Sequence, residues 1–175
     1  QLLEITQGLA YLHANDVVHG DIRGNNILID DSWHARLADF GLANFANETL
    51  RTVSSVMHAG STRWMAPELL SPEREGLERF ARTKASDIYA LGCTTLEIYT
   101  GNVPFSDVLD EGAVMLQVLH DLRPERPPEV SPDRWSLIKD CWGKNRAERK
   151  TAEQVLERME DMDFGESMEA NSDAG

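Results

Sequence analysis

The sequence of 175 residues is long enough for one domain with a buried core. It contains 30 acidic and 17 basic residues, and this formal net charge of −13 argues against nucleic-acid binding, which normally requires a basic patch. No apolar run is long enough to cross a membrane, and the N-terminus lacks the regions of a signal peptide, so we expect a cytoplasmic protein. The two cysteines, Cys93 and Cys141, form neither a disulfide framework nor a zinc pattern.

The first predicted element is a helix at the start of the chain. Gln1 lies within its pattern and has no capping residue before it, which suggests an incomplete chain. The turn pair Asn15-Asp16 should end the helix. The apolar residues at helical spacing are Leu2, Leu3, Ile5, Leu9, Ala10 and Leu12.

A polar loop follows at residues 19–26, reading His-Gly-Asp-Ile-Arg-Gly-Asn-Asn. Residues 26–39 then read as two short strands around an acidic turn, so the chain returns toward the loop at Asp39. The side chains of Asp21, Asn26 and Asp39 could therefore converge. Oxygen-bearing groups of this kind suit a hard cation such as magnesium.

A long segment with little periodicity begins after Asp39-Phe40-Gly41. Residues 42–64 are rich in Ser, Thr and Asn, and loops of this length are often functional. The segment leads into Gly-Ser-Thr-Arg-Trp-Met-Ala-Pro-Glu at residues 60–68.

The second half of the chain is predicted to be helical. One helix should begin at Ser86, a suitable N-cap, and run to about Thr100, with Gly101 at its C-terminal stop. It carries apolar residues on nearly all sides, which predicts a central, buried helix. Further helices are expected at residues 108–119, from Ser131-Pro132 onward, and from a capping box of Thr151 and Gln154 onward.

The last part of the chain is strongly acidic. From Glu157 to the end there are seven acids and one Arg, which is about half of the net charge. This composition predicts a tail at residues 161–175 without regular structure. A second Asp-Phe-Gly at residues 163–165 has no His-x-Asp loop ahead of it, and we interpret it as chance.

In order and spacing, these motifs resemble those of the protein kinase family, whose loop His-Arg-Asp-Leu-x-x-x-Asn precedes Asp-Phe-Gly and Ala-Pro-Glu. The resemblance covers residues 1–160 and implies a mainly α fold with a small β-hairpin, the large C-terminal lobe of a kinase domain. The small lobe is absent, because its Gly-x-Gly-x-x-Gly phosphate cover does not occur. The motifs are similar to those of Ser/Thr kinases of the tyrosine-kinase-like group, and the form of residues 19–26 resembles an expanded fungal set.

The resemblance implies transfer of the γ-phosphate of Mg-ATP to a hydroxyl of a protein substrate. Asp21 would orient this hydroxyl and accept its proton, and Arg23 would reach the γ-phosphate. Asn26 and Asp39 would each coordinate magnesium. Ser61 would bridge Asp21 and Arg23 through its hydroxyl group.

Six further positions have structural roles by the same resemblance: His19, Phe40, Gly41, Glu68, Asp87 and Arg149. His19 would pack beneath the Asp-Phe-Gly turn, where glycine permits the necessary backbone torsions. Asp87 would anchor the backbone of the polar loop. Glu68 would form a buried ion pair with Arg149.

Two positions depart from the family pattern. Arg23 replaces the usual Lys and keeps the charge, although a planar guanidinium is not equivalent to an ammonium group. Gly20 replaces an Arg that pairs with a phosphorylated residue of the activation segment. Because glycine cannot form this pair, activity should not depend on phosphorylation through that contact. The candidate hydroxyls are those of Thr49, Thr52, Ser54 and Ser55.

Two other interpretations stay open at this point. The protein could be a pseudokinase, which binds without transferring phosphate, or it could only dock partners through its helical surface. A strand Lys and a glycine-rich loop upstream would favour the enzyme. Without a small lobe, the chain alone is expected to transfer phosphate poorly or not at all. The sequence identifies neither the substrate nor the oligomeric state.

Overall fold

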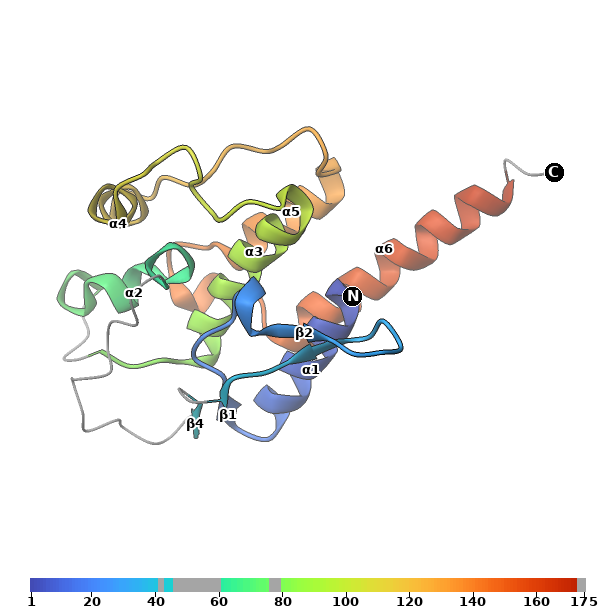
Figure 1. The fold of residues 1–175 in the computed structure, drawn as a ribbon, viewed down its shortest axis with the longest axis horizontal. Coiled ribbons are helices and arrows are strands. Elements are labelled where there is room, and N and C mark those ends of the chain that lie inside the picture. Colours follow the sequence, from blue (N-terminus) through green and yellow to red (C-terminus); the bar gives the residue numbers. More distant parts are fainter. Residues whose placement is uncertain (41–42, 46–60, 76–79, 173–175) are drawn as a thin grey trace.

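The structure, a computed structural model, describes residues 1–40, 43–45, 61–75 and 80–172. Within these ranges the fold is mainly helical, with a few short antiparallel strands, as predicted (Figure 1). The elements not discussed individually below are the 3-10 turns η1 (Gly24–Asn26), η4 (Thr62–Trp64), η5 (Pro72–Glu75) and η6 (Arg146–Glu148), and the short helix α2 (Pro67–Leu70).

The N-terminal helix is confirmed as α1 (Leu2–Ala14), and Asn15 is its C-cap. Ile5 and Leu9 are buried on its inner face. This helix packs against α6 (Ala152–Ser172) and against the strand β3 (Ala35–Leu37). The first and last helices therefore lie side by side (Figure 1).

The predicted hairpin consists of β2 (Ile27–Ile29) and β3, paired antiparallel with Ile27 opposite Leu37. Its turn is closed by the Asp30 carboxylate, which accepts the backbone N–H groups of Ser32 and His34 at 2.9 and 3.0 Å. Asp commonly forms such turns.

A second pair of strands was not predicted in the sequence. β1 (Val17–Val18) pairs antiparallel with β4 (Asn44–Phe45). This short pair connects the end of α1 to the chain that follows Asp39.

The central helix is α3 (Lys84–Thr100), whose residues from Ser86 to Leu96 are buried. Its predicted C-terminal stop is confirmed, because Gly101 adopts a left-handed φ of +66°. The predicted N-cap is wrong by three residues: Thr83 is the cap, and Ser86 is its partner in a capping box. The Thr83 hydroxyl accepts the Ser86 N–H at 3.2 Å, and the Ser86 hydroxyl accepts the Thr83 N–H at 2.9 Å.

The remaining helices are α4 (Glu111–Leu119), α5 (Pro132–Cys141) and α6. Ser131 caps α5 and Pro132 takes its first position, as expected. The capping box of Thr151 and Gln154 is confirmed by bonds of 3.2 and 3.0 Å. The helix α6 continues past residue 160 to Ser172, into the acidic segment where composition predicted no regular structure. The domain boundary at residue 160 stays a prediction.

Within the described residues, none of the helices combines the length and the apolar character that crossing a membrane requires. Both cysteines are free and buried, Cys93 on α3 and Cys141 on α5. Burial raises the pKa of each thiol to about 12, because the charged thiolate is disfavoured in the core.

The helices α3 and α5 approach each other closely at Gly92. A Cβ atom there would lie 2.8 Å from Trp142 Nε1 and 2.9 Å from the Cβ atom of Cys141. Replacing Gly92 with Ala should therefore lower the free energy of unfolding by about 1–3 kcal/mol, since an added methyl group forces a close-packed core to shift. Chemical denaturation followed by circular dichroism measures this change.

The matched control for this prediction is Gly8→Ala in α1. A Cβ atom at Gly8 meets Leu37 Cδ1 at 3.5 Å, an ordinary van der Waals contact. Alanine is also the better helix former, so the control should be neutral or stabilising. A Gly92→Ala protein as stable as the wild type would contradict the close approach of α3 and α5.

Candidate active site

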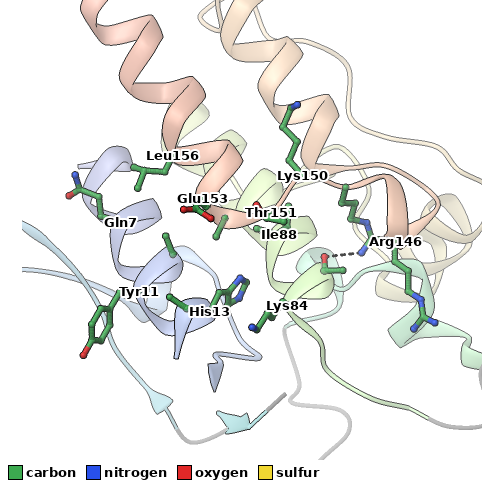
Figure 2. A pocket seen from close by; sticks show the side chains of 15 residues that line it. Gln7, Tyr11, His13, Lys84, Ile88, Arg146, Lys150, Thr151, Glu153 and Leu156 are labelled. Atoms are coloured by element: carbon green, nitrogen blue, oxygen red, sulfur yellow. Dashed lines mark hydrogen bonds between the residues drawn. The ribbon is translucent and has the colours of Figure 1, made fainter. Parts of the chain in front are cut away.

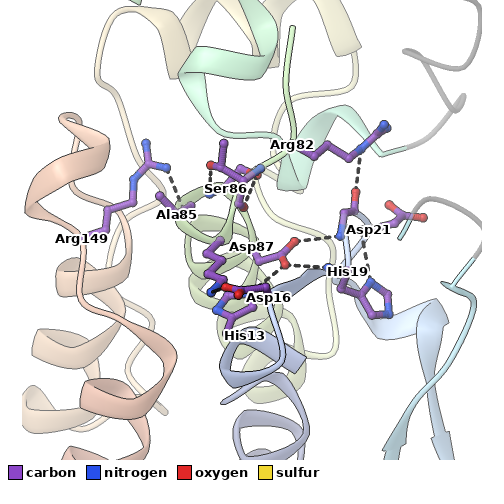
Figure 3. A network of polar contacts seen from close by, with 12 residues as sticks. His13, Asp16, His19, Asp21, Arg82, Ala85, Ser86, Asp87 and Arg149 are labelled. Carbon is purple, nitrogen blue, oxygen red and sulfur yellow. Dashed lines mark hydrogen bonds and ion pairs between the residues drawn. The ribbon is translucent and has the colours of Figure 1, made fainter. Parts of the chain in front are cut away.

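The polar loop at residues 19–26 is fixed to α3 by the carboxylate of Asp87 (Figure 3). Its Oδ2 accepts the backbone N–H of His19 at 2.8 Å, and its Oδ1 accepts that of Gly20 at 2.9 Å. The ring of His13 on α1 lies 3.0 Å from Oδ2. Asp87 is only 1% exposed, and these three contacts compensate the loss of water around its charge.

Two further side chains of α3 bind the same loop. The Thr94 hydroxyl lies 2.8 Å from the carbonyl oxygen of Ala90 in its own helix and 3.3 Å from that of Ile22, and Glu97 accepts the N–H of Gly24 at 2.9 Å. These residues follow Asp87 at helical spacing and share its face of α3. Loop residues 19 to 24 are therefore held in order along one side of the central helix.

His19 is fully buried and supports the loop from below. Its Nδ1 accepts the backbone N–H of Asp21 at 3.3 Å, and its Nε2 lies 3.1 Å from the carbonyl oxygen of Ala38. Both bonds form together when the imidazole is neutral with its proton on Nε2. The ring of Phe40 lies 5.2 Å from the His19 ring, measured between centroids.

The structure brings Asp21 and Asn26 into direct contact. Nδ2 of Asn26 donates to the carbonyl oxygen of Asp21 at 2.7 Å and to its carboxylate Oδ2 at 2.9 Å. Asn26 is buried, whereas Asp21 is partly accessible. One amide group therefore fixes both the backbone and the side chain of Asp21.

Ala38, the residue before Asp39, is bound to the polar loop through its backbone. The Ala38 N–H donates to the carbonyl oxygen of Asn26 at 2.9 Å, and the Ala38 carbonyl oxygen lies against His19. Asp39 itself is exposed and has a φ of +60°, a left-handed conformation that Asp tolerates better than most residues. The predicted position Gly41 lies outside the described residues.

Arg23 and Ser61 also meet, which is one half of the predicted bridge between Asp21 and Arg23. Nη1 of Arg23 donates to the Ser61 hydroxyl at 3.3 Å, and the guanidinium lies over the ring of Trp64, 5.6 Å from its centroid. The indole N–H of Trp64 donates to Glu97 at 3.0 Å. The carboxylate of Glu97 thus joins the polar loop to the segment that carries Ser61.

Glu68 and Arg149 form a buried, bidentate ion pair. Nη1 and Nη2 of Arg149 donate to the two carboxylate oxygens of Glu68 at 2.6 and 2.8 Å. The guanidinium also donates to the carbonyl oxygens of Gly143 and Ala85 and lies over the ring of Tyr89. The pair connects α2 to the start of α3 and to the turn before α6.

A second buried arginine was not singled out in the sequence. Arg63 donates to the carbonyl oxygens of Pro104, Phe105 and Val108 at 2.7–3.0 Å and pairs with Glu111 at 2.7 Å. It anchors the segment before α4 beside Ser61.

Four further residues that contact the polar loop or its anchor Asp87 were not identified from the sequence: His13, Arg82, Thr94 and Glu97. The helical spacing of Asp87, Thr94 and Glu97 was a signal for the last two, but the helix reads as apolar on nearly all sides. No local pattern marked His13 or Arg82.

Two cavities differ in which of the predicted site residues line them. One of about 700 Å³ lies between α1, the start of α3 and the start of α6, with Tyr11 and Leu156 in its lining (Figure 2). Of the predicted site residues only Arg149 lines it, and that guanidinium is bound to Glu68. A much smaller cavity is lined by Asp21 and Ser61 among others. We take the smaller one as the candidate active site because Asp21 and Ser61 line it.

The oxygen atoms of the site fit a hard cation. Among the described residues, no group of three or more His, Cys, Asp and Glu side chains could hold a metal ion. Magnesium needs fewer protein ligands, because it retains waters and binds substrate phosphates. The amide NH2 of Asn26 is used on Asp21, which leaves its amide oxygen available to a cation.

Comparison with known proteins gives a clear family. Residues 1–159 match the protein kinase domain, so the chain belongs to the protein kinase family. Mitogen-activated protein kinase kinase kinase 5 of Arabidopsis thaliana is 39% identical over 153 residues, covering 87% of this chain and 21% of that protein.

Two further relatives agree. A probable serine/threonine-protein kinase of Dictyostelium discoideum is 36% identical over 156 residues, covering 89% of this chain and 29% of that protein. Cell division control protein 7 of Schizosaccharomyces pombe is 38% identical over 142 residues, covering 81% and 12%. The chain thus spans less than a third of the length of each of these relatives.

Replacing Arg149 with Met should lower the free energy of unfolding by about 3–5 kcal/mol, because the carboxylate of Glu68 would stay buried without its partner. Chemical denaturation measures the loss. The control is Arg36→Met, which removes an exposed pair with Asp30 (3.2 Å) and should cost less than about 1 kcal/mol. Equal losses in the two variants would show that burial of the Glu68 pair contributes nothing special.

Proposed function

We propose that the chain is the large lobe of a Ser/Thr protein kinase domain, in which the complete domain transfers the γ-phosphate of Mg-ATP to protein hydroxyl groups. The observation that carries this proposal is the double hydrogen bond from Asn26 to Asp21. It holds a carboxylate at the accessible edge of a loop that is otherwise buried or anchored. Membership of the protein kinase family supports the same reaction.

Asp21 would act as the proton acceptor. A carboxylate in this role has to face the substrate hydroxyl in a fixed orientation. Its backbone N–H is bound by His19 and its side chain by Asn26, so both ends of the residue are restrained. Restraint of this kind reduces the entropy lost when the reacting groups meet.

Arg23 would hold the transferring phosphate. Its guanidinium is oriented by the Ser61 hydroxyl and the Trp64 ring. A cation positioned in advance stabilises the developing charge without rearrangement during the reaction. The Ser61 hydroxyl also connects the substrate side of the site to the loop that carries Asp21.

Mg-ATP is the expected cofactor and co-substrate, since protein kinases generally use it. Asn26 and Asp39 are the residues that would hold magnesium. The ion would supply charge neutralisation at the phosphates. Asn26 would then have two tasks, binding the metal through its oxygen and Asp21 through its nitrogen.

We infer Ser/Thr specificity from the form of residues 60–68, and one of the relatives, a probable serine/threonine-protein kinase, supports it. A protein substrate follows from the same inference. The second candidate is a pseudokinase or docking module without phosphoryl transfer. Gly20, which replaces the usual Arg of the loop, favours this alternative.

Replacing Asp21 with Asn in the full-length protein that contains this chain should lower kcat by about 10²–10⁴-fold, because the amide cannot accept the substrate proton. Transfer of labelled γ-phosphate to a generic protein substrate measures the rate. Phosphoamino-acid analysis of the product should yield phosphoserine or phosphothreonine.

The matched control is Asp31→Asn, the same chemical change at an exposed turn residue. It should keep the wild-type rate. Activity that survives in Asp21→Asn would contradict the role of Asp21. A folded wild-type protein with no activity above the Asp21→Asn background would favour the docking module.

Phosphatase treatment should leave the rate of the active protein unchanged, because Gly20 has no side chain to bind a phosphorylated residue. The candidate residues Thr49, Thr52, Ser54 and Ser55 lie outside the described residues. A large loss of rate after treatment, reversed by rephosphorylation at any of them, would disprove this independence.

A further inference from the structure

Gly20 is one of the two glycines of the polar loop and directly precedes Asp21. It has no side chain, and its φ of +84° lies in the region that glycine adopts without strain. The peptide unit that follows it, between Gly20 and Asp21, can therefore rotate easily unless other groups hold it. Its orientation decides where the backbone of Asp21 begins and so where the carboxylate lies.

Two side chains hold this peptide unit at opposite ends. Its carbonyl oxygen, on Gly20, accepts a hydrogen bond from Nε of Arg82 at 2.9 Å (Figure 3). Its N–H, on Asp21, donates to Nδ1 of His19 at 3.3 Å. The Gly20–Asp21 peptide is thus clamped between Arg82 and His19.

Arg82 is suited to this task by its position in the chain. It directly precedes Thr83, the N-cap of α3, and the capping box of Thr83 and Ser86 fixes the backbone there. The ring of Phe80 lies against the guanidinium, 5.1 Å from its carbon Cζ. The backbone of Arg82 is therefore fixed at the same end of α3 as Asp87.

The buried charge of Arg82 interacts with the carboxylates of Asp21 and Asp87. The residue is only 4% exposed, and burial lowers its pKa, while the carboxylates of Asp21 and Asp87 act in the opposite direction. A buried guanidinium is costly unless carboxylates and hydrogen-bond acceptors surround it. Arg82 also lines the small cavity that contains Asp21 and Ser61.

We propose that Arg82 is a positioning residue of the active site, which clamps the Gly20–Asp21 peptide from outside the loop and so orients the carboxylate of Asp21. The inference rests on the proposed function. Arg82 does not itself contact the substrate or the phosphate. It acts through the backbone of Gly20.

The test compares Arg82→Met and Arg82→Lys with the wild-type full-length protein. Arg82→Met removes the hydrogen bond and the charge, and kcat should fall by about 10–100-fold, since a small misplacement of a reacting group has effects of this size. KM for Mg-ATP should stay unchanged, because Arg23, Asn26 and Asp39 are retained. Arg82→Lys keeps a cationic donor and should lie between wild type and Arg82→Met.

A second readout, amide hydrogen exchange, does not depend on activity. In both variants the backbone N–H of Asp21 should exchange faster than in the wild type, with the larger effect in Arg82→Met, whereas the amides in the middle of α3 should be unchanged. If Arg82→Met does not fold, the exchange at Asp21 in Arg82→Lys decides alone. Faster exchange supports the clamp, and unchanged exchange overturns it.

Ser131→Ala is the control for a purely structural effect. It removes the hydroxyl that caps α5 but leaves Arg82, its partner Gly20 and the start of α3 unchanged. It should lower the denaturation midpoint without lowering kcat. A wild-type kcat in folded Arg82→Met, or an equal loss of kcat in Ser131→Ala, would overturn the proposal.

Different results contradict the proposed kinase reaction and the proposed role of Arg82. A wild-type protein with no activity above Asp21→Asn contradicts the proposed kinase reaction, while exchange at Asp21 still tests the clamp. An active wild type with an equally active Arg82→Met protein contradicts only the role of Arg82.

Discussion

The buried carboxylate of Asp87 is the interaction on which the candidate site depends. A charged group that is 1% exposed is costly, and here the N–H groups of His19 and Gly20 offset the cost. The first turn of α3 adds a favourable field, since a helix N-terminus stabilises negative charge. The same carboxylate accepts two backbone donors of the loop, so moving either the loop or α3 would leave polar groups of both without these hydrogen bonds. The position of the loop is therefore a consequence of the position of α3.

The rest of α3 extends this arrangement along the loop. Thr94 and Glu97 contact the loop at Ile22 and Gly24, so the loop runs alongside the helix. Glu97 also receives the indole N–H of Trp64, which brings the segment after the long loop to the same helix. One rigid element thus sets the relative positions of groups that are distant in sequence. This is how a chain with so few strands builds a site of defined geometry.

The parts of this arrangement that sequence reasoning predicted are those that a local motif encodes. Asp21 and Asn26 belong to one short loop, and the hairpin of β2 and β3 follows from its polar turn. The N-cap of α3 was misplaced because Thr83 and Ser86 are both suitable residues, and only the extended backbone of Thr83 decides between them. The pairing of β1 with β4 involves two residues on each side, too few for a visible pattern. Arg82 could not be predicted at all, since its contact with Gly20 depends on how α3 meets the loop in space.

Because Gly20 has no side chain, the loop at this position has to be held through its backbone. A residue with a side chain at this position can be held by partners of that side chain, whereas Gly20 offers only its N–H and its carbonyl oxygen. Both are taken by groups at the N-terminal end of α3, namely Asp87 and Arg82. The order of the loop is then linked to the folding of the helical core. In such an arrangement the loop is ordered whenever α3 is folded, and changes that loosen the start of α3 act on stability and on the site together.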